Sequence, residues 1–166
     1  MPDAMKLTGR LGRRRTIERA GGLRRTGDAA GAVELLAPIL LADAENAAAN
    51  VEMARALHVL GDLQGAEEHY RRAIREELDY KLVVELAGVV GSAGRVKEAE
   101  ELLGAALQMT EAVDGLDPGE ALLVSATLAA GQGRNDDARA ILDEIEAGNS
   151  GPDVREFSRR LREKLG

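Results

Sequence analysis

Four glycines at a nearly constant spacing constrain this chain more than any other feature of its sequence. Gly27, Gly61, Gly94 and Gly133 are separated by 34, 33 and 39 residues. One alanine stands seven residues before each glycine, another stands five residues after it, and a large apolar residue follows four positions later. These residues are Ala20, Ala54, Ala87 and Ala126, then Ala32, Ala66, Ala99 and Ala138, then Leu36, Tyr70, Leu103 and Leu142. A pattern kept in phase four times predicts a stack of similar units that share a continuous core.

Each unit has the periodicity of two amphipathic helices joined by a turn at the glycine. In residues 47–80, Met53, Ala54 and Leu57 share one face of the first helix, and Ala66 and Tyr70 share one face of the second. A glycine can adopt the left-handed conformation that ends a helix. The alanines in both helices predict close helix packing, because a larger side chain at the crossing would force the helices apart.

This pattern resembles the tetratricopeptide repeat, in which two antiparallel helices touch at small residues. The resemblance covers about residues 13–152. It implies an all-α, right-handed α-solenoid of about four helix-turn-helix repeats, at residues 13–46, 47–80, 81–113 and 118–152. The chain departs from the family where the first helix usually carries an aromatic residue, and the residues that stand there instead are Thr16, Asn50, Val83 and Leu122.

The segments that flank or interrupt the repeats have their own local signals. Residues 1–12 are expected to form a basic arm, because Gly9 and Gly12 disfavour a long helix. Pro38 is expected to bend or locally break the second helix of the first repeat. Asp117 and Pro118 are suited to begin a helix, as its N-cap and its first residue.

Residues 153–166 are expected to form an amphipathic helix that caps the last repeat. Their apolar positions follow a helical spacing and are Val154, Phe157, Leu161 and Leu165. The other positions are mostly charged, which suits a helix with one buried side and one side in water.

Composition narrows the function classes. The chain has no cysteine, which excludes disulfides and thiolate chemistry, and we expect a cytoplasmic protein. No apolar run is long enough to predict a membrane-spanning helix. The net charge of −7 is unevenly distributed, since residues 1–25 carry +6 and the remainder carries −13. The basic N-terminal segment is suited to bind an anionic partner or the acidic remainder of a second copy. Nucleic acid is a less favoured partner, because the N-terminal arm has no aromatic residue and the acidic remainder would repel phosphates.

The sequence shows no catalytic constellation. His58 and His69 occupy different repeat positions, and no serine has a base at a recognisable spacing. Gly131 and Gly133 are not followed by the Lys-Ser/Thr of a phosphate-binding loop. We therefore expect no enzymatic activity, no cofactor and no metal site.

The family resemblance implies that the first helix of each repeat lines a concave groove. The residues that this register places in the groove are Ile17, Arg24, Val51, Glu52, Arg55, His58, Lys81, Val84, Glu85, Gly88, Leu123 and Thr127. Ile17, Val51, Val84 and Leu123 form an apolar stripe, which either contacts a partner or packs within the helix array. A carboxylate clamp of the chaperone-binding kind is not supported, because Ile17, Gly21 and Glu52 stand at clamp positions.

These observations predict a non-enzymatic scaffold or adaptor that binds a peptide or helix of a partner protein in the groove. Two alternatives stay open. The first is a secretion-type chaperone for a hydrophobic subunit, because class II chaperones of type III secretion are similarly short members of this repeat family. The second is a self-assembling scaffold, in which the basic N-terminus of one copy contacts the acidic body of another.

Overall fold

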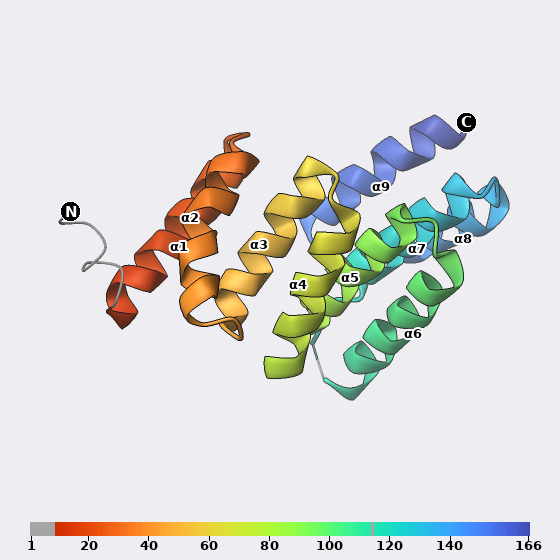
Figure 1. The fold of residues 1–166 in the computed structure, drawn as a ribbon. Helices are drawn as coiled ribbons and strands as arrows, with labels where there is room; N and C mark the ends of the chain where they lie inside the picture. The colour runs from red at the N-terminus through yellow and green to blue at the C-terminus, as the bar shows by residue number, and fades with distance from the viewer. Residues whose placement is uncertain (1–8, 114) are drawn as a thin grey trace. The chain divides into compact units, whose positions relative to one another are not determined.

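The computed structural model describes residues 9–113 and 115–166, and this part of the chain is all α-helical (Figure 1). Its helices, in chain order, are α1 (Arg10–Arg25), α2 (Ala29–Ala42), α3 (Ala47–Leu60), α4 (Leu63–Glu76), α5 (Tyr80–Ser92), α6 (Val96–Ala112), α7 (Gly119–Gly131), α8 (Asn135–Ala147) and α9 (Pro152–Leu165). Helices α1 to α8 make four helix-turn-helix pairs, and α9 follows the last pair. The predicted all-α repeat architecture is confirmed. None of the described helices is both long enough and apolar enough to cross a membrane.

The four phased glycines lie in the turns between the paired helices. Gly27, Gly61, Gly94 and Gly133 have φ angles of 98°, 83°, 81° and 74°. Residues with a side chain rarely adopt this left-handed conformation, which explains why glycine recurs at this position. The predicted role of these glycines in ending the first helices is confirmed.

The small residues predicted at the helix crossings are buried. All eight phased alanines, among them Ala54 and Ala66, have relative exposures of 0–1 %. The four large residues that follow are equally enclosed, at 0–2 %, and Tyr70 is the largest of them. The structure therefore confirms that these positions of α1 to α8 face the core.

The first compact unit comprises residues 1–82 and contains α1 to α4. Helix α3 packs against α4 and α2, and α1 packs against α2 and α3. Helix α1 begins at Arg10, so residues 10–12 belong to it and the prediction of an arm over these residues is wrong. The intrahelical bond from the Arg13 N–H to the Gly9 carbonyl holds this first turn. The rest of the predicted arm, residues 1–8, lies outside the described residues.

Helix α2 is one continuous helix, so the predicted local break at Pro38 is wrong, and the bend predicted as its alternative stays a prediction. Pro38 removes a single backbone donor, and its side chain is exposed. The Asp28 side chain caps the start of the helix by accepting a bond of 2.8 Å from the Gly31 N–H, as the sequence predicts. The buried positions Leu36 and Ile39 flank the proline and hold the helix in place.

Asn50 explains why the second repeat does without the usual aromatic residue. Its side chain is fully buried and donates to the carbonyls of Ala44 and Asn46 at 2.8 and 3.0 Å. Its Oδ1 lies 2.7 Å from Nδ1 of His69, and because Oδ1 only accepts, Nδ1 carries the proton. Asn50 thus ties the α2–α3 loop to α3 and α4. Burial lowers the pKa of His69, and the positive charge of Arg72 lowers it further.

The second compact unit comprises residues 83–166. Helix α7 packs against α6 and α8, and α9 packs against both α7 and α8. A cluster of buried residues, which includes Leu122 and Leu142, is sealed from the α9 side by Val154, Leu161 and Leu165. Helix α9 therefore covers the last repeat, as the sequence predicts for a capping helix.

The predicted inner face of α9 is wrong at one position. Phe157 is 58 % exposed, and Ser158 is fully buried. The buried line follows Val154, Ser158, Leu161 and Leu165, which is the i, i+4, i+7, i+11 spacing of a helix. A small residue at position 158 lets α9 approach its neighbours closely, and the phenylalanine is rotated out of the contact.

Asp117 links the start of α7 to the turn before α9. Helix α7 begins at Gly119, one residue later than the sequence predicts. Asp117 still accepts a bond of 2.8 Å from the Gly119 N–H, and its carboxylate also accepts from the Ser150 hydroxyl at 3.0 Å and the Gly151 N–H at 3.2 Å. One carboxylate therefore holds two helix starts together.

Candidate partner-binding surface

The first-helix surface of the first unit carries half of the predicted groove residues. Helix α1 supplies Ile17 and Arg24, and α3 supplies Val51, Glu52, Arg55 and His58. Val51 is half-buried and His58 is exposed, whereas Ile17 packs against the core of the unit. Lys81, at the start of α5, is exposed. This surface therefore offers one apolar side chain beside a group of charged ones.

Glu52 joins the charged residues of α1 and α3. Its Oε2 lies 3.3 Å from Nε of Arg24, and its Oε1 lies 2.7 Å from Nη1 of Arg55. The three side chains retain exposures of 14 % for Glu52, 20 % for Arg24 and 25 % for Arg55. Partial burial strengthens such pairs relative to fully exposed ones, because water screens them less. The sequence placed all three residues in the groove, and the structure brings them into contact.

Gly21 makes room for this cluster. A Cβ atom at Gly21 would lie 2.9 Å from Oε2 of Glu52 and 3.2 Å from Nη1 of Arg25. Any larger residue would displace the carboxylate or the guanidinium. Because two arginines pair with one carboxylate, this cluster keeps a positive charge.

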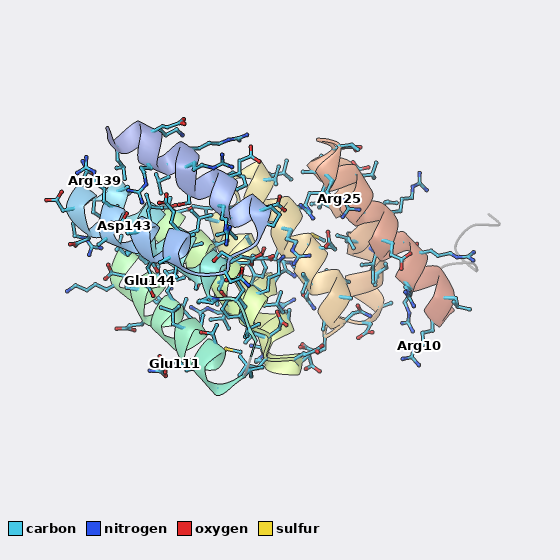
Figure 2. All side chains as sticks on the ribbon, turned by 180° about the vertical axis from the view of Figure 1, so that it is seen from behind. Arg10, Arg25, Glu111, Arg139, Asp143 and Glu144 are labelled. Carbon is cyan, nitrogen blue, oxygen red and sulfur yellow. The ribbon has the colours of Figure 1, made fainter. Side chains whose placement is uncertain are left out.

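An open pocket of about 560 Å³ lies beside the N-terminal half of α1, near the start of α3. Its lining residues are Arg10, Arg13, Arg14, Ile17, Glu18, Asp43, Asn46 and Ala48. Arg13 approaches Asp43 at 3.9 Å and Arg14 pairs with Glu18 at 2.9 Å, while Ile17 and Ala48 provide apolar area. Figure 2 shows Arg10 and Arg25 at opposite ends of α1, so basic side chains accompany the whole helix.

Sequence reasoning missed this pocket because it assigned the first twelve residues to an arm. The signal was present, since positions 10, 13, 14 and 17 follow the helical spacing of i, i+3, i+4 and i+7. The other wall of the pocket comes from the α2–α3 loop, through Asp43 and Asn46. That approach of loop to helix depends on tertiary packing, which the helical pattern does not report.

In the second unit two of the five predicted groove residues are part of the packing. Val84 has a relative exposure of 3 %, so the prediction that it lines a groove is wrong. Leu123 packs against the core of the unit, and Glu85 is half-buried. Thr127 is exposed, and its hydroxyl donates to the Leu123 carbonyl at 2.8 Å. The apolar stripe predicted from the sequence therefore packs mostly in the core. Val51 is the residue of the stripe that remains a candidate for contact with a partner.

The two glycines of α5 have different surroundings. A Cβ atom at Gly88 would meet nothing within 4 Å, so the space beside it is open. A Cβ atom at Gly91 would lie 2.5 Å from Cδ2 of Leu128, so Gly91 serves helix packing. Only Gly88 remains a candidate for contact with a partner.

The chemistry of these surfaces is that of contact and charge. Within residues 9–113 and 115–166, no group of three or more His, Cys, Asp or Glu side chains is placed to hold a metal ion. His69 is half-buried and bonded to Asn50, and His58 is exposed on α3. The surface of the first unit instead combines apolar area with fixed charges, as peptide-binding surfaces do.

The fold and this surface define the chain as an α-helical repeat protein. Two models of the tetratricopeptide repeat match residues 23–89 and 89–152, and together they cover most of the chain. The chain therefore belongs to the tetratricopeptide repeat family, whose fold generally serves protein interaction and not catalysis. No curated protein matches the sequence.

A solved structure shares the fold at low sequence identity. It is YrrB, described as a tetratricopeptide repeat protein with an unusual peptide-binding site. The match has a TM-score of 0.62 and 19 % identity, and it covers 90 % of this chain and 82 % of that chain.

Proposed function

We propose that this protein is a non-enzymatic scaffold or adaptor that binds a peptide or helix of a partner protein on the first-helix surface of its first unit. The observation that carries the proposal is the Arg24–Glu52–Arg55 cluster, which is partly exposed and lies on the same helices as Val51 and the pocket. Membership in a family of interaction repeats supports it, as does the peptide-binding site named for YrrB.

The surface supplies two kinds of interaction. Complete burial of an exposed apolar side chain contributes about 1.5–3 kcal/mol, and a partner that covers the half-buried Val51 would gain part of this. The ion pairs of Glu52 hold Arg24 and Arg55 in fixed positions, so less side-chain entropy is lost when a partner binds. A partner segment with one apolar anchor beside polar or acidic groups would satisfy both.

The experiment is affinity capture from the source cells with immobilised full-length protein. Val51→Asp is expected to lose the captured partner and to keep the helical circular dichroism of the wild type. Ala140→Asp, at an exposed position of α8, is the control and is expected to keep the partner. Retention of the partner by Val51→Asp, or unfolding of that variant, would show that Val51 does not belong to a binding surface.

Self-assembly is a second candidate, favoured by the arginines of α1. Among the described residues, Arg10, Arg15, Arg19 and Arg25 have no carboxylate partner, and the chain beyond residue 25 carries −13. A contact between this helix and the acidic body of another copy would weaken as salt is added. Light scattering that gives the monomer mass at both low and high salt would rule it out. The secretion-chaperone alternative and the cytoplasmic location stay predictions.

A further inference from the structure

The outward face of α2 is apolar at positions where α4, the second helix of the next repeat, is charged. The exposed residues of α2 are Ala30, Glu34, Ala37, Pro38, Leu41 and Ala42. The residues 34 positions later, on α4, are Gln64, Glu68, Arg71, Arg72, Arg75 and Glu76. A helix on the surface of a repeat protein normally presents polar residues to water, so the outward face of α2 is an exception within its own chain.

Contacts within the described part of the chain do not cover this face. Helix α2 packs against α1 and α3 through its other side, which includes Leu36 and Ile39. Leu41 has a relative exposure of 91 %, the highest among the large exposed apolar residues of the described chain. Glu34 is the charge on this face and Glu45 lies beside it, whereas the nearby Asp43 pairs with Arg13. A complementary surface would therefore combine an apolar side chain with basic ones.

Helix α9 presents such a surface. Its inner side seals the last repeat, and its outer side exposes Phe157, the one phenylalanine of the chain, at 58 %. The guanidinium of Arg160 lies 5.7 Å above the centre of the Phe157 ring. Arg160 also pairs with Glu156 on the same helix, and Arg159 and Lys164 are exposed beside them. Aromatic residues and arginine are the side chains that most often dominate binding energy at protein interfaces.

We infer that the outward face of α2 binds the outer face of α9 in a second copy of this chain. Leu41 and Ala37 cover the Phe157 ring, and Glu34 meets the basic residues beside it. Pairing of two α2 faces is disfavoured, because it would bring acidic groups of both copies together. The contact is head-to-tail, so each added copy leaves one free α2 face and one free α9 face.

The expected association is weak, because one helix on each side buries less area than a stable dimer interface needs. It uses surfaces other than the partner-binding surface of α1 and α3, so its failure would leave the proposed function untouched. It also differs from a contact of α1 arginines with an acidic body, because apolar burial persists at high salt whereas charge pairing does not.

Sedimentation velocity on the full-length protein, from micromolar to millimolar concentration at high salt, tests the inference. The mean mass is expected to rise with concentration above the monomer mass of 17.6 kDa. Leu41→Glu and Phe157→Glu are each expected to remain monomeric. An equimolar mixture of the two variants is expected to form a dimer and nothing larger, because one variant keeps α9 intact and the other keeps α2 intact. Leu78→Glu, at another exposed apolar position of the first unit, is the control and associates like the wild type.

Three results would overturn the inference. The first is a wild-type mass that stays at the monomer value over the whole range. The second is loss of association in Leu41→Glu and not in Phe157→Glu, which would indicate symmetric pairing of α2 faces or another partner surface. The third is a mixture of the two variants that stays monomeric although each variant keeps its helical circular dichroism.

Discussion

Replacement of a buried alanine at a helix crossing gives the sharpest test of the packing. Ala138 on α8 is fully buried, and Ala140, two residues later on the same helix, is exposed. Leucine adds three carbon atoms, for which the crossing of α7 and α8 has no space. Overpacking of this kind costs about 1–3 kcal/mol, which lowers the melting temperature of a chain of this size by about 2–12 °C. The same change at Ala140 is expected to alter stability by less than about 0.5 kcal/mol, because its side chain extends into water.

Thermal and urea unfolding followed by circular dichroism at 222 nm would measure both variants beside the wild type. The comparison within one helix removes the difference in helix propensity between alanine and leucine, since both sites carry the same exchange. Equal melting temperatures for Ala138→Leu and the wild type would refute the packing argument. A large loss in Ala140→Leu would show that the exposed side of α8 has been assigned wrongly.

Three further predictions concern single contacts. Gly91→Ala is expected to lower the free energy of unfolding by about 1 kcal/mol in denaturant unfolding, because its Cβ would lie 2.5 Å from Leu128 and displace that side chain. Gly88→Ala, with open space around it, is expected to raise the free energy of unfolding by about 0.5–1 kcal/mol. The reverse order of the two variants would contradict the assignment. His69 has a lowered pKa in the folded state, so below the ordinary pKa of 6.5 the unfolded chain binds more protons than the folded one, and the free energy of unfolding falls as the pH drops through that value. The variant His69→Gln should flatten this part of a curve of stability against pH. An unchanged slope would refute this role of His69. Asp117→Ala is expected to lower the free energy of unfolding by about 0.5–2 kcal/mol, seen as a lower urea midpoint, because three donors lose their shared acceptor. An unchanged midpoint would show that water replaces the carboxylate.

The repeat core was predictable from the sequence because its constraints are local and recur. A crossing of two helices accepts only a small side chain, and a left-handed turn accepts glycine, so Ala66 and Gly61 report structure directly. Each constraint appears four times, which fixes the phase of every helix pair. For the same reason Tyr70, the bulky residue between the helices, was placed correctly in the core.

The wrong predictions concern positions where a shift of one residue changes which side of a helix a side chain occupies. A step of one residue turns a helix by about 100°, so Phe157 and Ser158 exchange roles when the seam is read one position off. Val84 was assigned to a groove on the register of the other repeats, but its side chain is buried. A helix-starting signal is also weaker than a repeated one, which is why α1 begins at Arg10, before the predicted start of the first repeat at residue 13.

The candidate surface was predicted in part. Arg24, Glu52 and Arg55 were selected for their shared position on first helices, and they do form one ion-paired cluster. The pocket beside them was missed, because Asp43 and Asn46 reach it from a loop that has no repeat signature. Sequence periodicity reports which side of a helix faces the core, whereas a pocket depends on how separate elements approach one another.

The central claim is that the first-helix surface of the first unit binds a protein partner, and site-specific photo-crosslinking tests it most directly. A benzophenone amino acid would replace Val51 on α3 in one variant and Gln64, exposed on α4, in another. Irradiation in the source cells is expected to give a discrete covalent adduct with a partner protein from position 51 and none from position 64. Adducts from position 64 alone, or none from position 51 in a variant that keeps its helical circular dichroism, would contradict the claim.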